Sequence, residues 1–300
     1  NRPAPVTHGG VVAARISAEA ELRRSVLATM LWEDQAYEQG QSIADRIVDL
    51  VGRVDPQVVA NLAVEAREQQ NLRHVPLLLA AGLARVGGPL VGQTISKVIR
   101  RADELGEFLS IYWRNGRTPL SKQVKVGLAN AFGRFDAYSL SKYDRANEIR
   151  LRDVLFLTHA KPKDEAQAKL WKQLVDGTLP APDTWEVALS GGGDKKTEFE
   201  RLLSSGKLGY LALLRNLRNM EQSGVDKALV RDAILARKGA GNVLPFRYIA
   251  ASRAAPTFEP ELDKALLASI ADLPQFSGNT AVLVDVSGSM DAKLSGRSDL

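Results

Sequence analysis

The spacing of apolar side chains predicts helices along most of this chain. Between Ile16 and Asp272, apolar residues recur at intervals of three and four positions, the period of a helix with one buried face. Asp55 and Pro56 are typical of a helix start, because Asp caps free N–H groups and Pro suits the first turn. The predicted helical segments are residues 20–32, 42–54, 55–69, 76–85, 90–112, 121–132, 151–158, 164–175, 184–189, 195–204, 210–222, 226–238, 245–253 and 260–270.

Many helices of this length, joined by short turns, are typical of stacked helix hairpins. We therefore expect a mainly α fold, an α-solenoid of the HEAT-like kind, over residues 16–277, with residues 1–15 as an N-terminal extension. No clean sequence repeat accompanies the helices, so this expectation rests on helix number and loop length. Solenoids curve, and a closed or nearly closed curve would form a ring with a concave basic channel.

The pattern changes at residue 278. TAVLVDV, residues 280–286, is an almost continuous apolar run rich in β-branched side chains, with turn-forming residues on both sides. This pattern predicts a central strand of a parallel sheet, buried on both faces. Residues 278–300 are therefore expected to begin a separate α/β domain.

The strand is followed by DVSGSM, which places Asp285, Ser287 and Ser289 at alternate positions. One carboxylate and two hydroxyls are hard oxygen ligands of the kind that Mg²⁺ or Mn²⁺ prefers. Ligands in open α/β sheets also bind beyond the carboxyl ends of the strands. We expect a metal site here; the alternative is a polar turn after a buried strand.

Positive charge is concentrated in one part of the chain. Residues 112–163 hold eleven Lys or Arg against four acids, whereas the whole chain has a net charge of +5. Seven of the aromatic residues also fall there, and such interleaving suits single-stranded nucleic acid, with cations for phosphates and rings for base stacking. A solvated helical face over an ordinary aromatic core is the alternative. The candidate RNA contacts are Arg114, Arg117, Lys122, Lys125, Lys142, Arg145, Arg150, Arg152 and His159.

Composition excludes several other classes of protein. The chain has no cysteine, so thiol nucleophiles and zinc–thiolate sites are absent. No apolar run reaches the roughly 18 residues of a membrane span, and the first ten residues lack a signal pattern. We expect a cytoplasmic monomer. We also expect no enzyme, because the serines of DVSGSM do not fit Gly-x-Ser-x-Gly and GGGDKKT does not fit a Walker loop; Asp194 there is expected to cap a helix.

Several longer stretches carry a family resemblance. GRTPLSKQVKVGLANAFGRF (116–135), LRDVLFLTHAKPK (151–163), PAPDTWEVALSGGGDK (180–195), LLRNLRNM (213–220) and LPFRYIAA (244–251) resemble the TROVE module of the Ro autoantigen family, in the manner of a bacterial Ro homologue. DVSGSM after TAVLV resembles the metal-ion-dependent adhesion site of a von Willebrand factor A-like, Rossmann-like domain, which follows TROVE in that family.

The resemblance implies a ring of HEAT-like repeats that binds RNA. Family members bind Y RNA on the outer face of the ring and single-stranded ends of misfolded RNAs through its central hole, and bacterial relatives act with a 3′ exoribonuclease such as polynucleotide phosphorylase. Lys142 and His159 match positions of the Y RNA patch, and Arg145 lies one turn from Lys142. Ala146 and Ile149 stand where the family pattern has polar residues.

The resemblance also implies that the metal site is incomplete in this chain. In the family, a Thr and an Asp further along the A-like domain complete the ligand set, and the chain ends at Leu300. Three ligands alone would bind Mg²⁺ or Mn²⁺ weakly. The alternative function is that of a protein-interaction solenoid with such an adhesion-type site and no RNA ligand.

Overall fold

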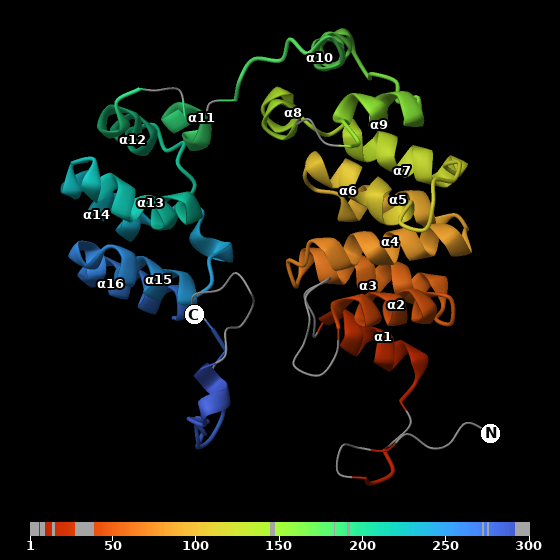
Figure 1. Cartoon of the computed structure of the whole chain (residues 1–300), viewed down its shortest axis with the longest axis horizontal. Coiled ribbons are helices and arrows are strands. Elements are labelled where there is room, and N and C mark those ends of the chain that lie inside the picture. The colour runs from red at the N-terminus through yellow and green to blue at the C-terminus, as the bar shows by residue number, and fades with distance from the viewer. Residues whose placement is uncertain are drawn as a thin grey trace. The chain divides into compact units, whose positions relative to one another are not determined.

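The computed structural model describes residues 6, 10–13, 16–27, 39–144, 148–182, 184–190, 193–271, 273–274 and 276–291. Within these ranges the chain is almost entirely helical, and its only β pairing is an isolated antiparallel bridge between Val6 and Val12. The helices form two compact units, Asn1–Pro180 and Ala181–Leu300 (Figure 1). Each unit has its own apolar core.

Unit 1 is a stack of short helices that follow one another in chain order (Figure 1). Neighbouring helices pack in pairs, α1 on α2, α3 on α4 and α5 on α7, as expected for stacked helix hairpins. Leu79, Phe108 and Phe132 are among its fully buried side chains. The helices are α1 (Ala18–Leu27), α2 (Gly40–Val51), α3 (Pro56–Glu68), α4 (His74–Val86), α5 (Leu90–Val98), α6 (Asp103–Tyr112), α7 (Lys122–Phe132), α8 (Ala137–Tyr143), α9 (Leu151–Thr158) and α10 (Glu165–Asp176).

Unit 2 repeats this hairpin arrangement around a second core. Helix α13 packs on α14 and α15, and α14 packs on α16, around buried Phe199, Leu217 and Tyr248. Asp194 caps α12 by accepting the N–H of Thr197 at 2.9 Å, which confirms its predicted role. The elements are α11 (Trp185–Ser190), α12 (Lys195–Ser204), α13 (Tyr210–Gln222), α14 (Lys227–Ala236), η1 (Ala240–Asn242), α15 (Phe246–Ala254), η2 (Pro256–Phe258), α16 (Glu259–Ile270) and η3 (Gly288–Asp291).

The predicted helix over residues 90–112 is wrong, because the structure divides it into α5 and α6. Ile99 has an extended backbone with ψ of 112°. The side chain of Glu104 then accepts the backbone N–H groups of Arg100 and Arg101 at 2.8 and 3.1 Å. These bonds replace helical bonds that a continuous helix would have made, so the break is stabilised from within α6.

Residues 280–286 also differ from the buried strand that the sequence predicts. They belong to no helix or strand, and their apolar side chains are exposed, Leu283 to 96%. A strand is stable only beside other strands, and no other strand is present in the described ranges. The short helix η3 follows directly.

The contact between α5 and α7 is close enough to require glycine. A Cβ on Gly127 would lie 2.7 Å from the carbonyl oxygen of Gly92 and 2.8 Å from Cβ of Ile95. We expect Gly127→Ala to lower the free energy of unfolding by about 1 to 3 kcal/mol, because the helices must separate to admit the methyl group. Urea denaturation measures this, with Gly133→Ala as control, since a Cβ there meets nothing closer than 3.5 Å. Equal midpoints for the two variants would contradict the close contact.

Candidate nucleic-acid interface

The structure distributes the predicted RNA-contact residues over separate clusters on α6 to α9 of unit 1. Lys122, Lys125 and His159 come together at one end of α7. Arg114 and Arg117 lie together after α6, in a different cleft. The remaining ones are Lys142 on α8, Arg150 and Arg152 at the start of α9, and Arg145, which lies outside the described residues.

The first cluster lines a cleft of about 470 Å³ between α7 and the end of α9, which we call the lysine cleft. Lys161, which was not among the predicted contacts, joins it from the segment after α9. No carboxylate is among its lining residues, and within the described ranges none of its three lysines forms an ion pair. The lining residues are Leu120, Lys122, Lys125, Val126, Ala129, Asn130, Thr158, His159, Ala160 and Lys161.

Local sequence explains how these cations meet. Ser121 caps α7 by accepting the N–H of Val124, so Lys122 and Lys125 stand one turn apart on the same side of the first turns. His159 ends α9 with a left-handed backbone, φ 52° and ψ 39°. This conformation turns the chain sharply, and Lys161 is thereby brought to the cleft that α7 lines.

The second cluster combines arginines with aromatic rings in a cleft of about 760 Å³, which we call the tryptophan cleft. The guanidinium of Arg117 lies 4.7 Å from the ring centre of Trp113, whose Nε1–H donates to the carbonyl of Thr118 at 2.7 Å. Phe156 of α9 is 60% exposed beside them. Arg114, by contrast, is bound to Asp45 at 2.9 Å, so its charge is partly compensated.

Lys142 lies among aromatic rings on α8 rather than in either cleft. Its Nζ is 5.5 Å from the ring centre of Tyr138 and 5.8 Å from that of Tyr143. Charge and aromatic rings are thus interleaved here, as the sequence indicated. Lys142 and His159, which the family resemblance paired, occupy different clusters.

Arg150 and Arg152 stand beside carboxylates at the start of α9. The N–H of Arg150 donates to the side chain of Asp153 at 2.9 Å. Burial raises the pKa of Asp144, and the nearby positive charges of Arg150 and Arg152 oppose that shift. Both arginines are exposed, so their charges remain accessible from solvent.

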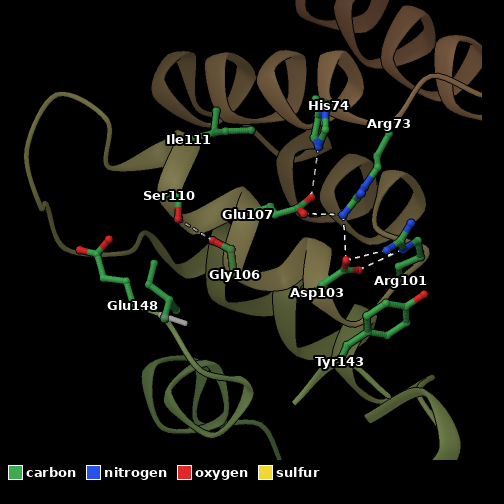
Figure 2. A pocket seen from close by; sticks show the side chains of 11 residues that line it. Arg73, His74, Arg101, Asp103, Gly106, Glu107, Ser110, Ile111, Tyr143 and Glu148 are labelled. Carbon is green, nitrogen blue, oxygen red and sulfur yellow. Dashed lines mark hydrogen bonds and ion pairs between the residues drawn. The ribbon is translucent and has the colours of Figure 1, made fainter. Parts of the chain in front are cut away.

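Figure 2 shows a third cavity, of about 580 Å³, in which the charges are paired within the protein. Asp103 accepts from Arg73 at 2.8 Å and from Arg101 at 2.7 Å. Arg73 also donates to Glu107, whose second carboxylate oxygen lies 3.6 Å from Nε2 of His74. Burial lowers the pKa of His74 and raises that of Glu107, because it disfavours the charged form of each group. This cavity offers less free positive charge than the lysine cleft.

The predicted metal ligands Asp285 and Ser287 lie in an exposed turn. Oδ1 of Asp285 accepts the backbone N–H of Ser287 at 2.8 Å, and that bond, with one from the Ser287 side chain, lowers the pKa of the carboxyl. The side chain of Ser289 lies outside the described residues. In the described ranges no three His, Cys, Asp or Glu side chains are grouped to hold a metal ion. The Mg²⁺ or Mn²⁺ site therefore stays a prediction.

Among the described helices, none combines the length and the apolar character that a membrane span requires.

Comparison with protein families gives a match in the second half of the chain. Residues 177–266 match the TROVE domain. Telomerase protein component 1 of Mus musculus is 34% identical over 89 residues, and that of Rattus norvegicus is 33% identical. Each alignment covers 28% of this chain and 3% of the relative. The TROVE match thus falls almost entirely in unit 2, and the lysine cleft lies outside it.

The helical fold extends further than the TROVE match. The crystal structure of the Deinococcus radiodurans Ro (RSR) protein superposes with a TM-score of 0.62 at 19% identity. The similarity covers 86% of this chain and 65% of that one. This likeness shows that the described helices share the fold of a Ro protein. These findings together support the resemblance to TROVE and Ro proteins; none of them concerns a von Willebrand factor A-like domain.

Proposed function

We propose that this chain is a non-enzymatic RNA-binding protein that holds a single-stranded segment of RNA in the lysine cleft. The observation that carries the proposal is the gathering of Lys122, Lys125, Lys161 and His159 around one cleft whose lining includes no carboxylate. The TROVE match and the Ro-like fold favour RNA over other polyanions. Y RNA and the single-stranded ends of noncoding or misfolded RNAs are the ligands we propose, with a 3′ exoribonuclease as a partner.

The state of the lysines supports phosphate binding. A lysine already held by a carboxylate must give up that contact when it binds a phosphate, whereas a solvated lysine loses no such contact and displaces counterions from the RNA. In the cavity of Figure 2, Arg73 and Arg101 form ion pairs with a carboxylate, so their positive charge is already compensated within the protein. The lysine cleft contains no such pairing among the residues described.

The tryptophan cleft supplies the second element of single-strand binding. Exposed aromatic faces stack on bases, because bases that are unpaired offer free π-faces. Phe156 presents such a face. It precedes His159 of the lysine cleft by less than one turn of α9, so the two clefts are neighbours along this helix. Phosphate contacts and base stacking can therefore act on one strand at neighbouring places along α9.

A salt titration tests the proposed function. Fluorescence anisotropy with a labelled uridine-rich RNA of about a dozen nucleotides should show affinity falling linearly with salt on logarithmic axes, by about 0.7 per phosphate contact. RNA that co-purifies with the protein should also be released at high salt. An affinity for this RNA that is undetectable at low salt, or that does not change with salt, would refute an electrostatic RNA interface.

Truncating the exposed ring should weaken RNA binding without changing its salt dependence. We expect Phe156→Ala to cost about 1 to 3 kcal/mol of binding free energy, the usual contribution of one stacked base. The salt slope should stay as in the wild type, because no phosphate contact is removed. Phe276→Ala is the matched control, since Phe276 is 85% exposed in unit 2, far along the chain from the interface. Equal effects of the two substitutions would argue against stacking on Phe156.

A further inference from the structure

A separate basic cavity lies at the other end of α7. It has a volume of about 490 Å³, is open to solvent, and is bordered by the end of α5, the turn between α7 and α8, and the first turn of α8. We call it the Arg134 cavity. Its lining residues are Ser96, Lys97, Arg100, Arg134, Phe135, Asp136 and Ser139. Because α7 has 11 residues, the two ends of the helix are about 16 Å apart, and the two sites share no lining residue.

The guanidinium of Arg134 is fixed in place by neutral acceptors. It donates to Oγ of Ser96 at 2.7 Å and to the carbonyl oxygens of Ser96 and Ile99 at 2.6 and 2.8 Å. These bonds orient the side chain but bring no negative charge to it. A fixed cation without a carboxylate partner is a preorganised group for binding an anion.

Two further cations lie next to Arg134. Lys97, in the last turn of α5, is exposed and lines the cavity. Arg100 also lines it and forms an exposed ion pair with Glu68 at 2.7 Å, so its charge is partly compensated. Burial and the positive charge of Arg100 both lower the pKa of Arg134. Two guanidinium groups that line the same cavity repel one another, and an anion between them would relieve that repulsion.

The single carboxylate of the cavity is already engaged. Asp136 caps α8, accepting the N–H of Ser139 at 2.8 Å, and the hydroxyl and N–H of Ser139 together lower the pKa of this carboxyl. The hydroxyl of Ser96 accepts from Arg134, so its own hydrogen remains to be donated. The cavity thus offers two cations without a carboxylate partner, Lys97 and Arg134, together with the hydroxyl donor of Ser96 and the paired Arg100.

We propose that the Arg134 cavity binds the dianion of a phosphate monoester. Within the described ranges Lys97 and Arg134 have no carboxylate partner, and their two positive charges match the charge of about −1.5 to −2 on a monoester at neutral pH. An internal phosphate of an RNA strand carries only one negative charge and would compensate only one of these two cations. The group can come from the terminal phosphate of an RNA or from a free nucleotide or inorganic phosphate. The site stands apart from the lysine cleft and does not depend on RNA binding there.

Isothermal titration distinguishes these sources. Inorganic phosphate and a nucleoside monophosphate are titrated into the full chain at constant ionic strength, followed by one short RNA with a 5′-phosphate, a 3′-phosphate or hydroxyl ends. The test variant is Lys97→Gln with Arg100→Gln, both exposed positions. The control is Lys196→Gln with Lys227→Gln, which removes two exposed lysines of unit 2 that line neither site. We expect the test variant to weaken binding of the monoester about tenfold and the control to leave it unchanged.

Each outcome of this experiment decides one point. A tighter affinity for one phosphorylated RNA end, lost in the test variant, supports the site and identifies the RNA terminus as the source. Binding of free phosphate or nucleotide without an advantage for either RNA end supports the site with a free ligand. Absence of phosphate binding, or equal binding by the test variant and wild type, overturns the proposal. Loss of RNA affinity in lysine-cleft variants that still bind phosphate shows that the two sites are independent.

Discussion

Replacing Lys122, Lys125 and Lys161 together with glutamine should lower the affinity for single-stranded RNA about 30-fold near 0.1 M salt. Each exposed charge contributes about 0.5 to 1 kcal/mol, so that three give about 2 kcal/mol. The salt slope should flatten by about 2, because up to three phosphate contacts are lost at about 0.7 each. Anisotropy titrations at several salt concentrations measure both quantities. The fold should be unaffected, since Lys122 and Lys161 are exposed and Lys125 is only half-buried.

A matched control removes the same number of charges elsewhere. Lys172, Lys196 and Lys227 are exposed lysines, each within 4.0 Å of a carboxylate. Their joint replacement with glutamine lowers the net charge equally but removes cations that are already paired. We expect a much smaller loss of RNA affinity. If both triple variants lose affinity alike, net charge and not the lysine cleft determines binding.

Replacing Glu104 with alanine should destabilise unit 1 by about 3 to 5 kcal/mol. The Glu104 side chain is fully buried and accepts hydrogen bonds from Nη2 of Arg67 at 2.7 and 2.9 Å, in addition to those from the backbone N–H groups of Arg100 and Arg101 between α5 and α6. Its removal leaves the Arg67 charge, which is 9% exposed, and both N–H groups without their acceptor. Urea denaturation followed by circular dichroism measures the loss.

Two comparisons separate the ion pair from general effects of truncation. Glu68→Ala removes an exposed partner of Arg100 and should cost no more than about 1 kcal/mol. Replacing both Arg67 and Glu104 with leucine-sized apolar residues should recover part of the loss, because no unpaired charge then remains buried. A cost below about 1 kcal/mol for Glu104→Ala would show that water or another group takes over its role.

The sequence could predict the helices because each buries one apolar face, and that requirement is visible as a period of three to four. It could not predict the break between α5 and α6, since apolar spacing continues across it and the break depends on a buried carboxylate. The short helix α8 was not predicted either. Its one clear signal is Asp136 three residues before Ser139, whose N–H it accepts. A short helix has too few apolar positions to show a clear period, and its stability depends on such caps.

The candidate site was predicted in part for a similar reason. Charge density identified the region but not which cations meet, because that depends on helix phase and on turns. Lys122 and Lys125 share a helical face and were found, whereas Lys161 reaches the cleft only through the turn at His159. For residues 280–286, in contrast, the pattern predicted an element that the structure does not form. The pattern describes a buried strand, but a strand needs neighbours that no described residue supplies.

The left-handed backbone at His159 has an energetic consequence for the lysine cleft. Residues with a Cβ adopt this conformation at a cost of about 1 kcal/mol or more, and glycine adopts it freely. The end of α9 is therefore less stable with histidine than it would be with glycine. With histidine, however, an imidazole lines the lysine cleft at this turn, where glycine would present only backbone. At position 159, glycine would favour the stability of the helix end, whereas histidine provides a side chain for binding, and the chain has histidine.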